Sequence, residues 1–426
     1  MKELLSDWGS EPLVVASNEG TGEVPEGEII YTRSGGNTIV ESIREFFAAV
    51  EQPSPEVQAA VDRFDPEGSA RVLSEPFATA QTMMGRRTFG VRRPRWSAWE
   101  DKMLVDRLWD DLEIPHAPYR IVNPVDAPDA ARELETELGT VWVADNSGGW
   151  HGGGDYVKWV SGADEYEEAV EWFKERARHV RVMPFLEGLP ASIHGWATDS
   201  GIAVFLPVEI LTLRHADRSG FVYAGVSTLW NATEQATEEM RRVAMSVGEA
   251  LSERDGYRGP YGIDGVLTAD GFRPTELNPR MSAGAGVQLG SVDLPLGLLM
   301  RCEIEGLVEV DHRWLEDAAI SQRKPRIHLG KMIDREVRDS MILQRTAGGG
   351  LIEGADGAEA IGKLVAGPST IGSYIFGEFD VERVGIGKTV GSLAADALNL
   401  ASEKWDLGLP GLVAAGERTN SREGRH

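Results

Sequence analysis

The sequence predicts an α/β protein of several domains, and three observations support this class. The chain has 426 residues, which at about 150 residues per domain predicts two to four domains. Hydrophobic residues make up 42% of the sequence, enough to bury a substantial core. Short apolar runs of strand character alternate with segments of helical spacing. We therefore expect mixed α/β (α+β) domains rather than a disordered or fibrous protein.

Charge and cysteine content limit the expected partners and location. Lysine and arginine number 43 and aspartate and glutamate 68, which gives a net charge of −25. Because such a protein repels polyanions, we do not expect nucleic acid as a partner. The single cysteine, Cys302, excludes an internal disulfide and fits a reducing compartment. With no signal-peptide pattern and no apolar run of about 18 residues, we expect a cytoplasmic protein without a membrane span.

The first domain is expected to cover residues 1–95. Apolar runs at residues 13–17 and 70–73 predict buried strands, and apolar spacing over residues 40–50 predicts a helix. Five arginines gather near the end of this segment, at Arg86, Arg87, Arg92, Arg93 and Arg95. Such a run is more often a solvated loop, and the functional alternative is a wall that binds an anion.

A second domain is expected to begin with a helix over residues 97–114. Its N-terminus carries Ser97 and, three residues on, Glu100, which is the spacing of a capping box. The elements predicted next are strand 119–122, strand 139–144, a glycine-rich loop at 145–155, strand 156–160, helix 165–178, strand 180–186 and helix 234–254. Residues 311–426, with a helix at 388–404, predict a third domain or an extension.

Residues 262–286 are the most informative segment, because they place Asp264, Glu276 and Asn278 on two strands of a predicted hairpin. Glu276 and Asn278 are two residues apart and therefore share a face. A two-residue Asp-Gly loop would turn Asp264 away from them. A three-residue loop over residues 269–271, with its glycine in the left-handed conformation, would pair Asp264 directly with Glu276. The Ala-Asp-Gly sequence favours the three-residue loop.

Two carboxylates and an amide oxygen this close together need either a proton or a cation between them. Oxygen ligands of this kind suit Mg²⁺ or Mn²⁺, completed by phosphate and water. The alternative is a set of solvated strand residues before an Asn-Pro turn. Arg280 and the small-residue loop at 282–286, which contains Ser282 and Gly284, add an arginine and backbone N–H groups. Together these groups favour a site for a transferring phosphoryl group.

The hairpin ends in Glu-Leu-Asn-Pro-Arg and resembles that of the ATP-grasp carboxylate–amine ligase superfamily. The resemblance covers roughly residues 96–310 and implies an ATP-grasp fold. It implies a glycine-loop subdomain at about 119–185 and a metal-binding subdomain at about 186–310. Residues 1–95 would form the pre-ATP-grasp domain and residues 311–426 a C-terminal domain. It also implies ATP and Mg²⁺, with Mn²⁺ as an alternative.

The resemblance further implies which residues bind the nucleotide. Lys102, in a Glu-Asp-Lys element, would contact the ATP phosphates, and a mobile glycine loop would cover the γ-phosphate. The strand between the subdomains would bind adenine through its backbone, because a proline there keeps its carbonyl acceptor although it lacks an N–H. The residues implied for the loop and this strand are Ser147, Gly148, Gly149, Pro184, Leu186 and, for the ribose, Glu187.

One position departs from the superfamily pattern. The strand before the glycine loop usually ends in a second phosphate-binding lysine, but here it ends in Ala144 and Asp145. Lys158 is the first candidate to supply the missing charge, and Arg214 is the second. The alternative for Lys158 is a surface residue of an edge strand.

Within the superfamily, the N-terminal domain, the DNSGGWHGGGDYVKW segment and the C-terminal extension resemble the pheganomycin-type peptide ligases. This resemblance implies a ligase that joins the carboxylate of a guanidino-bearing amino acid to the amine of a peptide, through an acylphosphate, in antibiotic biosynthesis. Arg280 would stabilise the oxyanion, with the backbone donors around Ser282 and Gly284. The alternatives are a small-molecule kinase and a non-catalytic nucleotide-binding protein. A homodimer is one alternative for the oligomeric state.

Other motifs fail on spacing. Gly387-Lys388-Thr389 is not a phosphate-binding P-loop, because position 382 is glutamate where that motif needs glycine. The glycines from 284 to 290 are one residue too far apart for the dinucleotide fingerprint. The eight histidines show no paired ligand spacing, and His151 is more readily a plain loop residue than a catalytic one.

Overall fold

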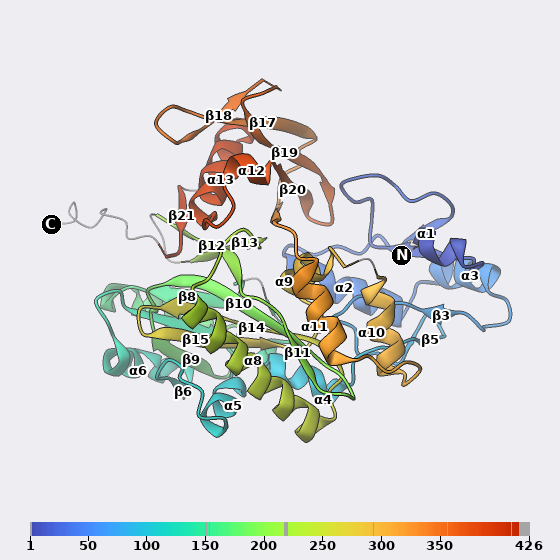
Figure 1. Cartoon of the computed structure of the whole chain (residues 1–426), viewed down its shortest axis with the longest axis horizontal. Helices are drawn as coiled ribbons and strands as arrows, with labels where there is room; N and C mark the ends of the chain where they lie inside the picture. Colours follow the sequence, from blue (N-terminus) through green and yellow to red (C-terminus); the bar gives the residue numbers. More distant parts are fainter. Residues whose placement is uncertain are drawn as a thin grey trace.

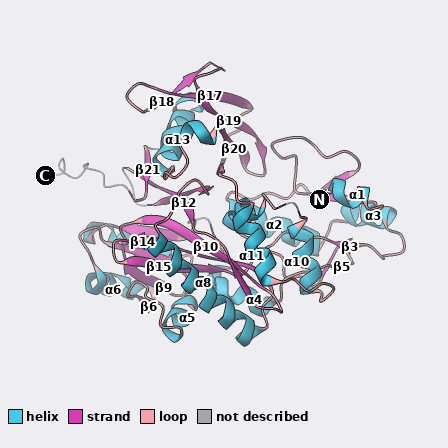
Figure 2. Cartoon of the chain, in the orientation of Figure 1, coloured by secondary structure: helices cyan, strands magenta, loops and turns pink. Residues whose placement is uncertain are grey.

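The computed structural model of the protein describes residues 2–149, 151–152, 154–216, 220–292, 294–355, 357–409 and 411–416. Figure 1 shows a central body, with the N-terminal residues beside it and the C-terminal strands and helices above it. Figure 2 shows helices and strands mixed in every part, which confirms the predicted α/β class. Within the described ranges, no helix is both long enough and apolar enough to cross a bilayer.

The N-terminal part combines short strands with helices. It contains α1 (Lys2–Asp7), β1 (Val14–Ala16), β2 (Ile29–Tyr31), α2 (Ile39–Glu51), α3 (Pro55–Phe64), β3 (Arg71–Val72), β4 (Thr82–Met83) and β5 (Arg86–Thr88). Thr38 caps α2 by accepting a hydrogen bond from the Glu41 N–H, and Ser54 caps α3 in the same way. Both helices place valines in one core with Met83.

The predicted helix over residues 97–114 is interrupted. It forms α4 (Pro94–Ser97), η1 (Ala98–Glu100) and α5 (Val105–Asp111), with Asp101 in an extended conformation between them. The predicted capping box is wrong, because Ser97 donates its hydroxyl to the Pro94 carbonyl. The Glu100 carboxylate accepts hydrogen bonds from Arg92 and Arg280. Ion pairing from outside the helix therefore replaces the local cap.

A four-stranded antiparallel sheet follows, in the order β6-β9-β7-β8. Its elements are β6 (Arg120–Val122), η2 (Pro124–Asp126), α6 (Ala127–Leu134), β7 (Thr140–Ala144), η3 (Asn146–Gly148), β8 (Val157–Val160), η4 (Ala163–Glu165), α7 (Tyr166–Lys174) and β9 (Val180–Pro184). One face, with Trp142 and Ala144, packs against α6 and α7. The other face carries Val141, Val143 and Met183 and contacts Phe221. The two faces therefore have different roles.

The large sheet has 12 strands, ten of which follow the order β15-β14-β10-β12-β13-β16-β20-β19-β17-β18. Its central elements are β10 (Leu189–Ala197), β11 (Ile202–Val204), β12 (Val208–His215), β13 (Phe221–Ser227), α8 (Glu234–Asp255), β14 (Gly259–Thr268), β15 (Gly271–Asn278), α9 (Ala283–Leu289), α10 (Leu296–Ile304) and α11 (His312–Ser321). Helix α8 confirms the helix predicted at 234–254. Met240 and Val247 on α8 share a hydrophobic core with Ile263 of β14, so α8 supports the strands that carry the predicted site.

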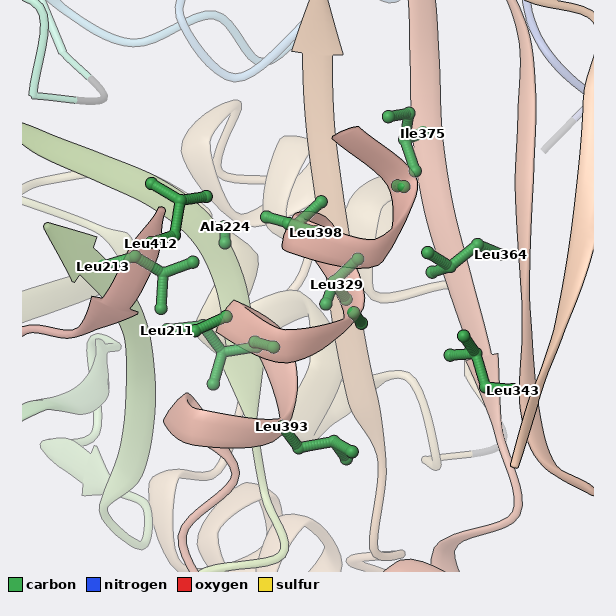
Figure 3. Packing of buried hydrophobic residues seen from close by; sticks show 14 of the residues in the cluster. Leu211, Leu213, Ala224, Leu329, Leu343, Leu364, Ile375, Leu393, Leu398 and Leu412 are labelled. Atoms are coloured by element: carbon green, nitrogen blue, oxygen red, sulfur yellow. The ribbon is translucent and has the colours of Figure 1, made fainter. Parts of the chain in front are cut away.

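The C-terminal part continues this sheet through β16, which pairs with β13. It contains β16 (Ile327–Ile333), β17 (Asp339–Arg345), β18 (Leu351–Gly354), β19 (Ala360–Ser369), β20 (Gly372–Phe379), α12 (Val381–Val384), α13 (Gly391–Trp405) and β21 (Leu412–Ala414). Figure 3 shows Leu398 of α13 between Leu211 of β12 and Leu364 of β19. This core joins the C-terminal helix to the central strands.

Candidate active site

Strands β14 and β15 place Asp264 directly opposite Glu276, as the sequence predicted. The predicted three-residue loop is nevertheless wrong. Thr268 pairs with Gly271, so the loop contains only two residues, at 269–270. Gly271 has a positive φ of 108° but belongs to β15. A second feature of the hairpin must therefore restore the register.

That feature is a β-bulge. Gly265 pairs with Pro274, whereas the preceding residue, Asp264, pairs with Glu276. Thr275 is therefore an extra residue in β15. The Thr275 hydroxyl donates a hydrogen bond of 3.2 Å to the Asp264 carbonyl. β15 is the edge strand of the sheet, where a proline such as Pro274 is tolerated. The bulge turns Glu276 onto the face of Asp264.

The structure brings the predicted metal-binding side chains together. Asn278 donates a hydrogen bond of 3.0 Å from Nδ2 to Oδ2 of Asp264. Glu276 forms an ion pair with Lys102, with 3.1 Å between Oε1 and Nζ. The Lys102 side chain is 8% exposed and the Glu276 side chain 26%. Lys102, predicted to contact phosphate, thus lies directly beside the carboxylates.

The two carboxylates have different proton affinities. Burial and the neighbouring Glu276 carboxylate raise the pKa of Asp264 to about 6. Burial acts on Glu276 in the same direction, but the positive charges of Lys102 and Arg280 together outweigh it and lower the pKa of Glu276. The repulsion between the two carboxylates therefore appears as a raised pKa of Asp264. A bound cation would relieve this repulsion.

Arg280 is held at the end of the hairpin. Its Nη2 donates to Asn278 Oδ1 at 2.8 Å, and its Nε donates to Glu100 Oε1 at 2.9 Å. Its guanidinium lies over the Phe77 ring, 4.4 Å from the centroid. Glu100 is buried and also accepts from Arg92 at 2.7 Å. The charge of Arg280 is thus fixed beside the predicted metal ligands.

The arginine cluster divides into two groups: Arg87, Arg93 and Arg95 are exposed, as in a solvated loop, whereas the other two are buried. Arg86 is buried and donates to Asp65 at 2.9 Å. Arg92 is buried too and donates to the Pro279 carbonyl at 3.2 Å as well as to Glu100. Arg92 therefore joins the N-terminal part to the site, and it shares the Glu100 carboxylate with Arg280.

Asp145 organises the start of the glycine loop. Its carboxylate accepts hydrogen bonds from the backbone N–H groups of Ser147, Arg178 and His179, at 3.2, 3.2 and 2.9 Å. The Ser147 hydroxyl also donates to it. Burial opposes these bonds, but together they lower the pKa of Asp145. The carboxylate thus ties the start of the loop to the backbone just before β9.

The loop itself is described in part. Gly148 ends η3, and Gly149 has a φ of 97° beside the Arg44 guanidinium of α2. Trp150 and Gly153 of the predicted loop lie outside the described residues. Gly149 therefore lies beside the N-terminal part.

His151 is a buried loop residue. Its Nε2 lies 3.1 Å from the Ala144 carbonyl, and its ring stacks on Tyr156 at 4.7 Å. Burial, with the nearby Lys102 charge, lowers the pKa of His151 to about 4. The contacts of Nε2 and the stacked ring support the plain loop interpretation.

The assignment of Lys158 to the phosphate site is wrong. Lys158 pairs with Trp142 across β7 and β8 and so shares the face that packs against α6 and α7. Its Nζ lies 3.0 Å from Glu168 and 5.3 Å from the Trp172 ring centroid, both on α7. Ala144 is on this face as well. The side chain therefore points away from the face that carries Met183.

Arg214, the second candidate, lies between the two sheets. It is buried on β12, and its guanidinium is 5.5 Å from the ring centroid of Trp159. The Trp159 ring contacts Phe185, with 5.1 Å between centroids. Arg214 is thus better placed than Lys158 to supply a positive charge between the sheets.

The predicted adenine segment follows β9. Pro184 pairs with Thr140 at the strand end, and Leu186 lies against the apolar cluster that includes Val143 and Met183. Glu187 is exposed. This segment connects the four-stranded sheet to β10.

The predicted small-residue loop at 282–286 is instead the start of helix α9. Ser282 caps the helix by accepting a hydrogen bond from the Ala285 N–H at 3.4 Å. A β-carbon at Gly284 would lie 2.3 Å from Cε1 of His194. Gly284 therefore packs against a buried histidine in the first turn of the helix.

The sequence reasoning missed a buried polar chain beneath the hairpin. Ser192 and His194 lie on β10, and Gln288 lies on α9. The Ser192 hydroxyl is 3.1 Å from His194 Nε2 and hydrogen-bonds to Asp264. Polar residues at every second position of an otherwise apolar strand were the available signal.

Known proteins identify the fold. No family model matches the sequence, and no curated protein matches it. Biotin carboxylase from Campylobacter jejuni, in a β,γ-ATP complex, is 11% identical with a TM-score of 0.56, covering 89% of this chain and 85% of that chain. N5-carboxyaminoimidazole synthase from Aspergillus clavatus, with ADP and 5-aminoimidazole ribonucleotide, is 12% identical with a TM-score of 0.51, covering 94% of each chain.

An ADP complex of N5-carboxyaminoimidazole ribonucleotide synthetase is also similar. It is 12% identical with a TM-score of 0.50, and the match covers 94% of this chain and 93% of that chain. At these identities the likeness establishes the fold alone. The chain has the ATP-grasp fold, as the sequence predicted.

Proposed function

We propose that this protein is an ATP-dependent ligase that forms an amide bond between a carboxylate and an amine. One observation carries the proposal. Asp264 and Glu276 face each other on the hairpin, with Lys102 beside Glu276 and with Asn278 joining Asp264 to Arg280. This arrangement of carboxylates and cations suits phosphoryl transfer.

Mg²⁺ or Mn²⁺ would be held by Asp264, Glu276 and the amide oxygen of Asn278. These are the hard oxygen donors that such ions prefer, and the raised pKa of Asp264 supports a missing positive charge. The described residues contain no cluster of three or more His, Cys, Asp or Glu that could hold a metal, so phosphate oxygens would complete the shell. The ion would neutralise charge on the transferring phosphoryl group.

Asn278 has to turn for this role. Its amide now donates N–H to Asp264 and accepts from Arg280 through its oxygen. Rotation of the amide group by half a turn exchanges these two atoms. The oxygen would then face the ion.

ATP would bind between the two sheets. Lys102 would contact its phosphates, and the loop of Ser147, Gly148 and Gly149 would cover them. The apolar face that carries Met183 suits an adenine ring. The remaining proposed contacts are Pro184, Leu186, Glu187 and Arg214. ADP in two of the similar structures supports this choice of nucleotide.

The reaction would proceed in two steps. A carboxylate oxygen of the substrate attacks the γ-phosphorus, and the bond from the γ-phosphorus to the β-phosphate oxygen breaks. ADP departs, and the substrate carboxylate becomes an acylphosphate. The amine nitrogen then attacks the acyl carbon, and phosphate departs as the nitrogen loses its proton. Arg280 would stabilise the tetrahedral oxyanion, a contribution of about 3 to 4 kcal/mol in comparable sites.

The substrates we propose are an amino acid and a peptide, in the biosynthesis of a peptide natural product. The support is the resemblance of the glycine-loop segment and the domain order to pheganomycin-type ligases. The proposal includes a cytoplasmic location, with a homodimer as one alternative for the assembly.

Release of ADP, measured for amino acids crossed with short peptides, identifies the substrates. Oxygen-18 placed in the active acid's carboxylate then tests the mechanism. A ligase moves one labelled oxygen into the released phosphate, because the acylphosphate forms through that atom. Phosphate without the label, or a phosphorylated product that accumulates, would overturn the ligase in favour of a kinase.

A non-catalytic nucleotide-binding protein is the second candidate. It is favoured by the placement of Lys158 against α7 and by the bond between the Asp145 carboxylate and the His179 N–H. Tight ATP binding without ADP release, across the whole substrate screen, would support it over the ligase.

A further inference from the structure

We infer that His194 is a positioning residue, which holds Asp264 through Ser192 in the orientation needed to bind the metal ion. This inference rests on the proposed function, since Asp264 is a metal ligand only within it. It concerns side chains beneath the hairpin that contact neither nucleotide nor substrate in that proposal.

The chain of contacts is continuous and buried. Gln288 Nε2 lies 3.0 Å from His194 Nδ1, and His194 Nε2 lies 3.1 Å from the Ser192 hydroxyl. Ser192 pairs with Asp264 across β10 and β14, and its hydroxyl bonds to the Asp264 carboxylate. Gln288 is 3% exposed, and His194 and Ser192 are 1% exposed. Three elements of the fold therefore meet at one carboxylate.

The chemistry of the two ends fixes the direction of these bonds. An ionised Asp264 can only accept, so the Ser192 hydroxyl gives its proton to Asp264 and accepts from His194. His194 must then carry its proton on Nε2 and accept at Nδ1. The Gln288 amide nitrogen, a donor, faces that atom. Both ends thus require the same tautomer.

The imidazole has to remain neutral for this to work, because a charged ring could not accept from Gln288. Burial lowers the pKa of His194 to about 3, so the ring stays neutral near pH 7. The two ring nitrogens of His194 contact Ser192 and Gln288, and neither of these contacts is with a carboxylate.

Two glycines fix where the ring lies. A β-carbon on Gly262 of β14 would be 2.8 Å from His194 Cδ2, and one on Gly284 of α9 would be 2.3 Å from His194 Cε1. Either side chain would displace the ring. The ring is therefore confined by the strand that carries Asp264 and by the helix that follows Arg280.

Ser192 and Asn278 together determine how Asp264 is turned. Asn278 bonds to Oδ2 from the neighbouring strand, and Ser192 bonds from the other side of β14. When the Asn278 amide turns its oxygen to the ion, the bond from Ser192 remains. His194 would then keep Asp264 aligned in the metal-bound state.

Binding of Mn²⁺ in the presence of ADP tests the inference, with free Mn²⁺ counted by electron paramagnetic resonance. Ser192→Ala and His194→Phe should raise the Kd for Mn²⁺ about 10- to 100-fold, the usual effect of removing an outer-shell partner. His194→Gln should restore most of the affinity, because its amide nitrogen can replace Nε2 as the donor. Ser373→Ala, at a buried serine on β20, should leave the Kd unchanged.

The outcomes separate the two proposals. If the wild-type protein binds neither ADP nor Mn²⁺, the proposed function fails and this inference fails with it. If the wild type binds both, and folded Ser192→Ala binds Mn²⁺ as tightly as Ser373→Ala does, the inference alone is overturned. Should His194→Phe not fold, Ser192→Ala decides the question.

Discussion

Arg181 of β9 donates a hydrogen bond of 3.0 Å to the backbone carbonyl of Thr275, the extra residue in β15. The same guanidinium forms an ion pair with Asp106 of α5, with 2.6 Å between Nη2 and Oδ1. Both side chains are almost completely buried. The strand that precedes the adenine segment therefore supports the bulge that turns Glu276 toward Asp264.

Asp106→Ala should destabilise the protein strongly. It leaves the Arg181 charge buried without a partner, which typically costs about 3 to 5 kcal/mol in the free energy of unfolding. Asp111 lies on the same helix as Asp106 and forms an exposed ion pair with Arg254 of α8. Asp111→Ala should therefore cost about 1 kcal/mol or less. Chemical denaturation of the two variants measures both costs. Equal costs would show that the buried pair does not stabilise the fold.

Asp264→Asn should abolish ADP formation while leaving the melting temperature unchanged or higher. The substitution removes a metal-binding oxygen and also the repulsion between Asp264 and Glu276, which contributes to the raised pKa of Asp264. Glu276→Gln should abolish ADP formation too. Unlike the first substitution, it also leaves Lys102 without its counter-charge. Full turnover by either variant would contradict the metal-binding role of the hairpin.

Lys102 and Lys158 should behave differently toward ATP. Lys102→Met should raise the KM for ATP roughly 10- to 100-fold, because a hydrogen bond between charged groups contributes about 1.5 to 3 kcal/mol. Lys158→Met removes an ion pair with the exposed Glu168 and a contact with the Trp172 ring, and it should change this KM about twofold at most. Initial-rate kinetics distinguish the two. A large effect of Lys158→Met would return that residue to the phosphate site.

The sequence was informative where residue type alone decides the outcome. The paired carboxylates on the hairpin and the lysine beside them followed from strand alternation and the family resemblance. The length of the hairpin loop could not be predicted in this way, because it depends on the bulge at Thr275. The bulge is supported by Arg181, which is distant in sequence. A register error of one residue was therefore concealed by a second irregularity.

The face of a side chain was equally hard to predict. Lys158 could be assigned to a strand but not to one side of it, because both faces of the four-stranded sheet are covered. Only the pairing with Trp142 settles its direction. In the same way, the partners of Glu100 are ion-pairing groups beyond its own helix, so local capping rules placed it wrongly.

Glu209 should make stability depend on pH. It is buried on β12, and its carboxylate accepts hydrogen bonds from the backbone N–H groups of Val390 and Gly391, at 2.8 and 2.9 Å, at the start of α13. Burial raises its pKa from 4.5 to about 7, against the opposite effect of these bonds. The folded state therefore binds a proton more tightly than the unfolded state, so this stabilisation is complete below pH 4.5 and is lost as pH rises through 7.

Glu209→Gln isolates this effect, because glutamine has the shape of the protonated acid and does not ionise. The melting temperature of the variant relative to the wild type should rise between pH 5 and pH 8, by the equivalent of about 3 kcal/mol at most. Glu303, whose pKa burial also raises to about 7, is present in both proteins and cancels from the difference. If the relative melting temperature instead falls with pH, the hydrogen bonds from α13 outweigh burial, and the Glu209 carboxylate stabilises the helix as an anion.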